Sequence, residues 1–511
     1  MKSIGNRCFI MIIWGLSLIH NCWAQDHSVQ PARIFGSHMV LQCDAPIRIW
    51  GRAEEGDPVK ITLDRETVKT KTNDSGDWSV IFSPRKASFQ PITLQINDIR
   101  FDDILIGEVW ICSGQSNMEF PLSRTKNSTN LLQKANVDGL RFCSHGGLSL
   151  VAKNGFLQKE LDRCNVQEFF RAQWVSSQSD SAAGTSAVAW VFGRGLFGGL
   201  DVPVGIIQVA VGGSAMNNWI PPEAARTNLL TASLYEKDWL SNKDVYINHR
   251  NRARDAFQNV LKPGEAYIIG KTPYRWMCEP GFLFEAGIAP LKGLAFRGVV
   301  WYQGESDTWS DSIIEKAPGL FSLLVNSWRQ YFSEGDFPFI YVQLPGHNAR
   351  LWPPFREMQR DAEQTLPNTA MVVTIDLGEP KNVHPRDKQP VGERVLRMAL
   401  KQAYGQTNLL GFPEIDKIKK EEGQLIIKCC EVGKGFLPVE GKIPGFEVAD
   451  ESGVFRAAVA VLSSFDTLVV KSPVTDPVEI RYGWQPYPSP SLKLFNSDKL
   501  PLGPFVMPVA E

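Results

Sequence analysis

The sequence predicts an α/β fold, in which an open, doubly wound parallel sheet is flanked by two β-rich regions. Between residues 104 and 405, near-continuous apolar runs alternate with helical patterns, as expected for parallel strands buried on both faces. Short strand-like runs separated by turn residues lie on either side of this region. The chain has 511 residues, enough for about three domains of roughly 150 residues each.

The first 24 residues are expected to be a secretory signal peptide rather than part of the fold. Lys2 and Arg7 precede an apolar run over residues 9–19, and Ala24 supplies a small residue for cleavage. The run is short for a membrane anchor, and the neighbours of Cys22 do not favour lipidation. We therefore expect an exported protein, periplasmic or secreted, with no membrane span after signal removal.

Three further regions are predicted from the composition. Residues 25–103 resemble an N-terminal β-sandwich domain with a turn at 73–77, and residues 406–511 form a C-terminal β-rich region. The central domain spans residues 104–405. Its predicted strands and helices are, in order, strands 104–112, 204–211, 298–302, 338–344 and 370–375 and helices 187–200, 314–331, 355–366 and 389–404.

Charge and cysteine usage exclude several classes of protein. The chain carries 54 Lys and Arg against 55 Asp and Glu, so no general positive field would recruit nucleic acid. Nine cysteines are present, and the seven beyond the signal are too few and too scattered for a disulfide framework. The seven histidines show no metal-ligand spacing. We expect neither a metal nor another cofactor.

Four of the predicted strands end in small or polar residues. Ser116 follows the first strand, Gly212 and Gly213 the second, Gln303 the third, and His384 lies shortly after the last. In an open α/β sheet, ligands bind beyond the carboxyl ends of the strands. These residues are therefore expected to form one site suited to acyl transfer.

Each residue type fits a step of that chemistry. Ser116 would begin a helix and needs a base to become a nucleophile, and His384 titrates near neutral pH. Gly212 or Gly213 could offer a backbone N–H to an oxyanion, and Gln303 a side-chain amide. Taken singly, each residue has an ordinary structural explanation, such as a helix cap, a turn or a surface histidine. The set in this order favours a catalytic site.

At these residues the sequence resembles the sialate O-acetylesterase family of SGNH-type serine hydrolases. The resemblance lies in Gly-Glu-Val-Trp-Ile-Cys-Ser-Gly-Gln-Ser-Asn-Met over 107–118, Trp-Tyr-Gln-Gly-Glu-Ser-Asp over 301–307, and His-Pro at 384–385. It extends to segments 35–42, 202–207, 374–378 and 494–505. The resemblance implies an SGNH-type esterase domain, with Ser116 as nucleophile and His384 as general base. It also implies an oxyanion hole formed by the Ser116 N–H, Gly213 and Gln303.

The third member of a triad departs from the family pattern. Many SGNH hydrolases place an aspartate three residues before the histidine, and Lys381 stands there in this chain. Three ways of orienting His384 stay open: a backbone carbonyl, the side chain of Asn382, or Asp376 reaching across.

The resemblance implies removal of O-acetyl groups from sialic acids through an acetyl-Ser116 intermediate. Another acetylated glycan, such as xylan, is the nearest alternative, and a non-catalytic carbohydrate-binding protein is an alternative of another class. Trp219, Trp309 and Trp352 are candidates for stacking on a sugar. Arg350 and Arg356 are candidates for binding the sialic acid carboxylate. The oligomeric state is left open by the sequence.

Overall fold

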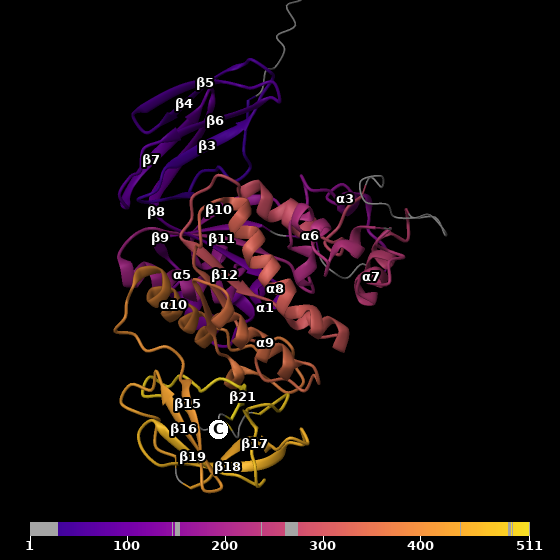
Figure 1. Cartoon of the computed structure of the whole chain (residues 1–511). Coiled ribbons are helices and arrows are strands. Elements are labelled where there is room, and N and C mark those ends of the chain that lie inside the picture. The colour runs from indigo at the N-terminus through magenta and orange to yellow at the C-terminus, as the bar shows by residue number, and fades with distance from the viewer. Residues whose placement is uncertain are drawn as a thin grey trace, which may run out of the picture.

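A computed structural model of the chain describes residues 29–145, 147–148, 154–236, 238–260, 274–439, 441–488, 492 and 494–509. The described residues form three sheets. In Figure 1 the N-terminal strands, the central α/β region and the C-terminal strands follow one another along the long axis of the molecule. The predicted signal peptide lies outside the described residues. In the described part of the chain, no helix combines the length and apolar character needed to cross a bilayer.

The central sheet has the strand order β10-β9-β11-β8-β12-β13-β14. All neighbouring strands on this path are parallel except the antiparallel pair of β9 and β10. Strands β11 and β12 are buried along their whole length, which explains their unbroken apolar sequence. The strands are β8 (Ile99–Gly114), β9 (Val137–His145), β10 (Ala172–Ser177), β11 (Val204–Ala210), β12 (Gly298–Tyr302), β13 (Phe339–Val342) and β14 (Thr369–Val372).

Helices cover both faces of this sheet (Figure 1). Helices α5 and α10 pack against each other on one face, where Trp110 meets Phe192 edge to face. Helices α8 and α9 pack together on the other face, where Trp328 of α8 meets Trp301 of β12. The helices are α1 (Ser116–Glu119), α2 (Ser128–Gln133), α3 (Gln158–Leu161), α4 (Ser179–Ala183), α5 (Ala187–Leu200), α6 (Pro222–Thr227), α7 (Ile247–Phe257), α8 (Asp311–Phe332), α9 (Trp352–Thr365) and α10 (Gln389–Tyr404).

The N-terminal strands are joined to the central sheet through one strand, β8. Residues 99–106 of β8 pair with β7, whereas residues 108–114 pair with β11. The expected boundary at 103/104 thus falls inside a continuous strand. The N-terminal strands are β1 (Gln30–Pro31), β2 (Val40–Gln42), β3 (Ile47–Arg52), β4 (Pro58–Leu63), β5 (Glu66–Lys71), β6 (Asp77–Phe82) and β7 (Ser88–Ile96). Strands β1, β3 and β6 form a separate three-stranded sheet.

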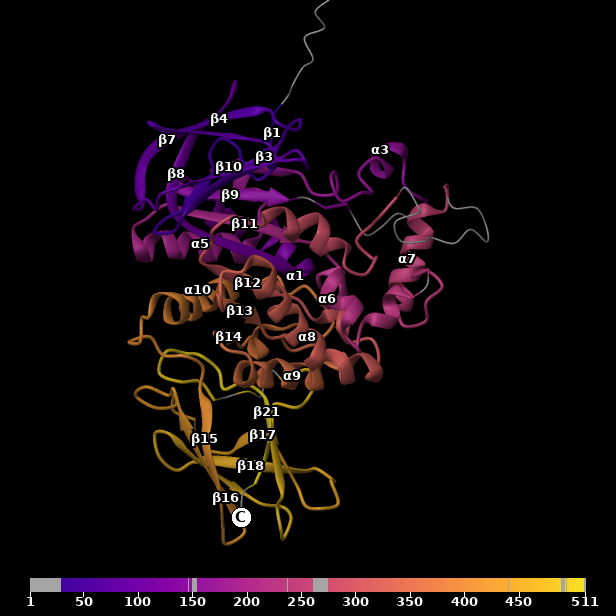
Figure 2. The same ribbon diagram turned by 45° about the horizontal axis from the view of Figure 1, so that its top comes forward.

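The C-terminal sheet lies at the end of the molecule opposite to the N-terminal strands, and it is separate from the central strands (Figure 2). Its seven strands are all antiparallel and follow the order β15-β16-β19-β18-β17-β20-β21. They are β15 (Glu414–Glu421), β16 (Gln424–Cys430), β17 (Ile443–Ala449), β18 (Arg456–Leu462), β19 (Thr467–Lys471), β20 (Glu479–Tyr482) and β21 (Phe505–Pro508).

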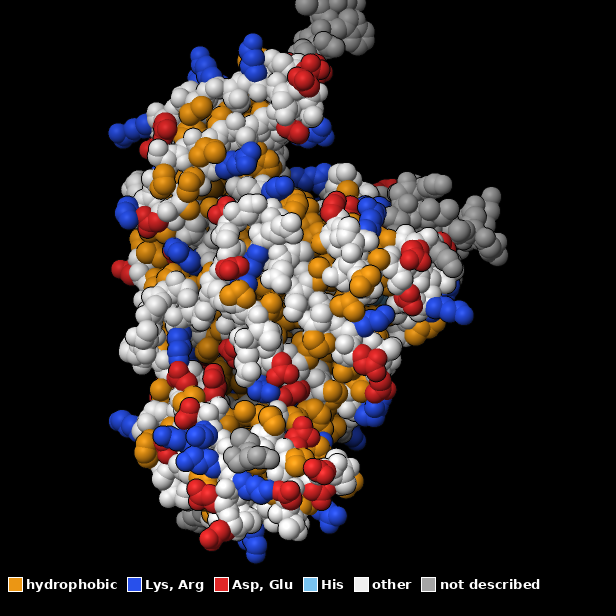
Figure 3. Space-filling model, viewed as in Figure 1, with side chains coloured by type: hydrophobic (Ala, Val, Ile, Leu, Met, Phe, Trp, Pro, Cys, Tyr) orange, Lys and Arg blue, Asp and Glu red, His pale blue; other side chains and the backbone are white. Residues whose placement is uncertain are grey.

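Neither the charge pattern of the surface nor the cysteines point to a particular function. Positive and negative side chains are interspersed over the face shown in Figure 3, in keeping with a net charge of −1. Among the described residues, the seven cysteines from Cys43 to Cys430 form no disulfide with one another.

Candidate active site

Ser116 lies at the turn from the end of β8 into α1. The turn requires glycine at position 114, where φ is +136° and a Cβ would lie 2.2 Å from the carbonyl oxygen of Tyr302. Gln115 donates its backbone N–H to the same carbonyl at 3.0 Å. The close approach of β8 to β12 thus fixes where the Ser116 side chain leaves the backbone.

His384 lies in the loop between β14 and α10, and its Nε2 is 2.8 Å from the Ser116 Oγ. Burial lowers the pKa of the imidazole below its ordinary value of 6.5, and the positive charges of Lys388 and Arg124 lower it further. His384 is therefore neutral at pH 7. A neutral imidazole at this distance can accept the hydroxyl proton.

Neither side chain considered for orienting His384 contacts its ring. Asp376 makes a bidentate ion pair with Arg394, with both N–O distances 2.7 Å. Asn382 instead holds the backbone of His384: its Oδ1 accepts the His384 N–H at 3.0 Å, and its Nδ2 donates to the His384 carbonyl at 2.9 Å. Within the described ranges, Nδ1 of His384 has no hydrogen-bond partner. The structure corrects the expected role of Asn382 from holding the ring to holding the loop.

Asn117 is a site residue that the sequence reasoning missed. It is fully buried, and its Nδ2 donates to the carbonyl of Val383 at 2.9 Å and to the Glu305 carboxylate. Its Oδ1 accepts a hydrogen bond from Lys388. Burial lowers the pKa of Lys388 to about 7. Asn117 therefore ties the segment that bears Ser116 to the loop that bears His384.

The structure distinguishes between the two glycines at the end of β11. The Gly212 N–H donates to Oε2 of Glu119 at 2.8 Å and is therefore occupied. Gly213 adopts a φ of +74°, and its N–H, like that of Ser116, has no partner among the described residues. Both Gly213 and Ser116 line the same cavity. Two residues of the cavity wall thus have N–H groups without a partner among the described residues, beside the Ser116 hydroxyl.

Gln303 does not offer the donor that the sequence predicted. Its Nε2 donates to the Ser214 carbonyl at 3.1 Å and to the Asp307 carboxylate, and its side chain is 1% exposed. Asp307 also accepts hydrogen bonds from the Tyr246 hydroxyl and the Met216 N–H. Burial raises the pKa of Asp307 to about 6. The amide is used inside this buried network and lies away from the cavity lining.

The cavity at Ser116 and His384 has a volume of about 420 Å³, and most of its exposed wall is apolar. Of the three tryptophans considered for sugar stacking, Trp309 and Trp352 line it, and Trp309 is 56% exposed. Trp219 does not, because it is fully buried against Trp301. The complete lining is Gln115, Ser116, Gly213, Arg252, Glu305, Ser306, Thr308, Trp309, His347, Ala349, Trp352, Val383 and His384.

The two arginines expected to meet a substrate carboxylate are committed elsewhere. Arg350 forms an exposed bidentate pair with Asp311, and Arg356 is fully buried among backbone carbonyls, including that of Gln485 at 2.7 Å. Arg252 of α7 lines the cavity instead, and it forms no ion pair or hydrogen bond with any other described residue. Nothing local in the sequence marks Arg252, because α7 reaches the cavity only through the tertiary fold.

A serine hydroxyl against a neutral imidazole, beside two open N–H groups, is the constellation of an ester hydrolase that acts by acyl transfer. Residues 268–401 match the family model described as a carbohydrate esterase, sialic acid-specific acetylesterase. The resemblance to the sialate O-acetylesterase family is confirmed by these comparisons, and the chain is a carboxylic ester hydrolase.

Individual relatives agree with the family model. The chain is 29% identical to the sialate O-acetylesterase of Mus musculus over 416 residues, which is 74% of each chain. It is 29% identical to the Homo sapiens sialate O-acetylesterase over 446 residues, 78% of this chain and 76% of that one. A solved carbohydrate acetylesterase from Xanthomonas citri superposes with a TM-score of 0.75 at 25% identity, over 94% of this chain and 99% of that chain.

Proposed function

We propose that this protein is a serine esterase that removes O-acetyl groups from sialic acids. The observation that carries the proposal is the 2.8 Å contact between Ser116 Oγ and His384 Nε2 at the wall of a cavity that also contains Arg252. The sialate O-acetylesterases similar to this chain give the substrate class.

The proposed acylation step uses Ser116 and His384 directly. The Ser116 hydroxyl gives its proton to Nε2 of His384 as Oγ attacks the acetyl carbonyl carbon, and the carbonyl electron pair moves to its oxygen. The N–H groups of Ser116 and Gly213 receive this oxyanion. Collapse of the tetrahedral intermediate expels the sugar oxygen, which takes the proton from Nε2, and leaves acetyl-Ser116.

Deacylation repeats these transfers with water. His384 takes a proton from water as the water oxygen attacks the acetyl carbon, and Ser116 leaves with that proton while acetate is released. Because no carboxylate contacts Nδ1 among the described residues, we propose a Ser–His dyad. An imidazolium without a carboxylate partner is stabilised less, and Asn382 supplies orientation through the backbone of the loop.

Arg252 favours an anionic sugar as the substrate. An arginine at the wall of a mostly apolar cavity, with no partner in the described part of the chain, is available for bidentate binding of a carboxylate. Sialic acids carry a carboxylate and neutral xylan sugars do not. Measuring acetate release from O-acetylated sialic acid and from acetylated xylan in parallel tests this choice, and faster release from xylan would overturn it.

A second candidate is deacetylation of another glycan, which the similarity to a carbohydrate acetylesterase favours. Ser116→Ala separates both candidates from a non-catalytic carbohydrate-binding protein. We expect the variant to lose acetate release and keep its fold. Unchanged hydrolysis by Ser116→Ala would overturn the proposed site.

We also propose the finer organisation on which this function depends. The central region 104–405 would be a doubly wound, SGNH-type esterase domain between a β-sandwich domain at 25–103 and a β-rich region at 406–511. Residues 1–24 would direct export to the periplasm or the medium, where acetylated glycans are accessible. Mass spectrometry of the mature N-terminus tests cleavage after Ala24.

A further inference from the structure

A second cavity adjoins the one that contains Ser116. It has a volume of about 290 Å³, and Trp309 lines both cavities. The two cavities also share α7, because Asn248 and Arg250 line the second and Arg252 lines the first. A ligand extending past Trp309 would therefore pass from one cavity into the other.

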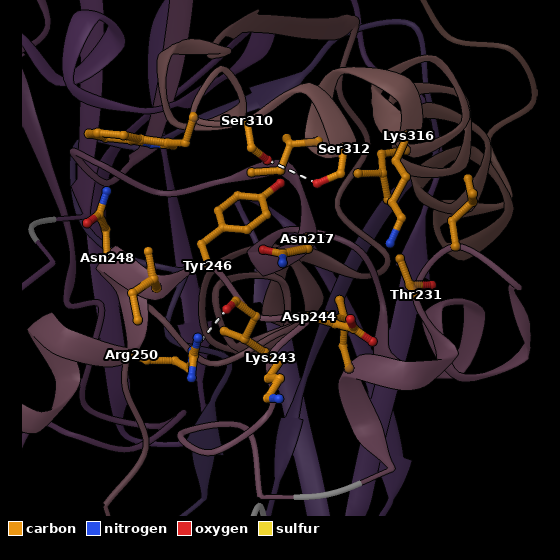
Figure 4. Close-up of a pocket in the computed structure, with 17 residues that line it drawn as sticks. Asn217, Thr231, Lys243, Asp244, Tyr246, Asn248, Arg250, Ser310, Ser312 and Lys316 are labelled. Carbon is orange, nitrogen blue, oxygen red and sulfur yellow. Dashed lines mark hydrogen bonds between the residues drawn. The ribbon is translucent and has the colours of Figure 1, made fainter.

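Asn217 gives the second cavity an unused binding group. The residue is 4% exposed, and its Oδ1 has no hydrogen-bond partner among the residues that the structure describes. Figure 4 shows Asn217 at the centre of the lining residues, between Tyr246 and Lys316. A buried acceptor without a hydrogen bond is unfavourable, so a ligand hydroxyl that donates to Oδ1 would be bound favourably.

The other lining groups suit a sugar. Lys316 points toward Thr231 in Figure 4 and forms no ion pair with a described residue. Ser310 and Ser312 add hydroxyls, whose oxygens lie 3.1 Å apart. The exposed face of Trp309 provides an apolar surface of the kind on which sugar rings stack. Amide, ammonium, hydroxyl and indole groups together match a ring that carries many hydroxyls.

The floor of the second cavity is rigid and is connected to the catalytic centre. Tyr246 donates its hydroxyl to Asp307 at 2.6 Å. Asp307 in turn binds the Met216 N–H at 3.0 Å, which fixes the segment next to Asn217. Both cavities are thus built on one buried network, which keeps their spacing constant.

We propose that the second cavity binds a further sugar unit of the acetylated glycan, adjacent to the unit whose acetyl group reaches Ser116. The proposal rests on the proposed function. It makes the preferred substrate an acetylated oligosaccharide rather than a free acetylated monosaccharide, with Trp309 between the two subsites.

The test compares a matched pair of substrates: O-acetylated sialyllactose and free O-acetylated sialic acid. If the wild type prefers xylan, the pair is an acetylated xylo-oligosaccharide and acetylated xylose. We expect the wild type to prefer the oligosaccharide in kcat/KM. Asn217→Leu and Lys316→Met should each reduce this preference about tenfold, through KM, as expected for the loss of one well-formed hydrogen bond.

Lys428→Met, on the exposed side of β16, is the control and should leave the preference unchanged. A wild type without preference, or an unchanged preference in both cavity variants, would overturn the second subsite. Hydrolysis of p-nitrophenyl acetate by the wild type and by Ser116→Ala is measured in the same set of experiments. If Ser116→Ala is active, the proposed function fails; if it is inactive while the preference persists in the cavity variants, only the second subsite fails.

Discussion

The two cavities on either side of Trp309 differ in what their groups are able to do. The first contains Ser116 and His384, the proposed nucleophile and base, and two N–H groups without a partner among the described residues, within a mostly apolar wall. The second contains an unpaired amide, hydroxyls and lysines, and its titratable groups include no comparable pair of nucleophile and base. We therefore expect the chemical step and sugar binding to depend on different side chains. Kinetic measurements on variants of these side chains can distinguish the two.

The largest expected effect comes from removing the nucleophile. Ser116→Ala should lower kcat by at least about 10⁴-fold for every acetyl ester, because the hydroxyl takes part in both chemical steps. Steady-state acetate release measures this. The affinity for a deacetylated oligosaccharide, measured by calorimetry, should stay unchanged; joint loss of turnover and binding would show that the two cavities are not separable.

The next largest effect is expected for Asn117, because it fixes the relative position of Ser116 and His384 and is not expected to contact the substrate. Asn117→Ala removes the hydrogen bond to the Val383 carbonyl and leaves Glu305 and Lys388 without their shared partner. We expect kcat to fall about 100-fold from a misplaced dyad, with KM nearly constant.

The same variant should lower the free energy of unfolding by about 1–3 kcal/mol, since buried polar groups lose a partner. Thermal unfolding measures this loss separately. A normal kcat together with a lower unfolding temperature would mean that Asn117 stabilises the fold and does not position the dyad.

Arg252 should affect the choice of sugar. Arg252→Met removes the charge and keeps an unbranched apolar side chain, and we expect the preference for acetylated sialic acid over acetylated xylan to fall about tenfold. Arg350→Met is the matched control, because Arg350 is paired with Asp311 at the surface. Equal effects of the two variants would remove Arg252 from recognition.

The smallest expected effect is a shift in pH dependence. His384 must be neutral to act as a base, and its lowered pKa puts the acidic limb of kcat/KM below pH 6.5. Lys388 is charged at that pH, since its pKa is about 7, and its charge favours the neutral imidazole. Lys388→Met should therefore move the acidic limb to higher pH.

Lys381→Met, in the same loop, is the control for this shift, because Lys381 is not among the charges that lower the pKa of His384. An acidic limb that stays in place in Lys388→Met would show that burial and Arg124, and not Lys388, lower the His384 pKa.

Much of the central fold was predictable, because strands buried on both faces have unbroken apolar sequences. Strands β11, β12, β13 and β14 and the helices α5, α8, α9 and α10 overlap the predicted ranges closely, whereas β8 begins at residue 99, before the predicted start at 104. Strands β9 and β10 were missed, since Val137–His145 and Ala172–Ser177 mix polar with apolar residues. Their place in the sheet depends on β11 and on each other.

The site residues that follow strand ends were predictable from the sequence. Ser116, Gly213 and His384 meet because parallel strands end at one edge of the sheet. Gln303 follows a strand end as well, yet its amide is taken up by Ser214 and Asp307, and no local pattern reveals such partners.

The recognition residues were not predictable from local patterns. Arg350 lies just before α9 and Arg356 lies within it, and an aspartate and backbone carbonyls satisfy them. Arg252 and Asn217 lie in the segment between β11 and β12, whose packing over the cavities depends on contacts distant in sequence.

Strand β8 also affects which truncations and fusions of this protein are expected to fold. Its first half completes the N-terminal strands and its last residues lead to Ser116. Excising residues before 99 would strip hydrogen-bond partners from the strand that presents the reactive hydroxyl, whereas the C-terminal sheet contributes no strand to the central one. Removing residues before 99 should therefore disturb the strand that bears Ser116, whereas a cut after residue 405 leaves the strand pairing of the central sheet intact but takes the Gln485 carbonyl from the buried Arg356.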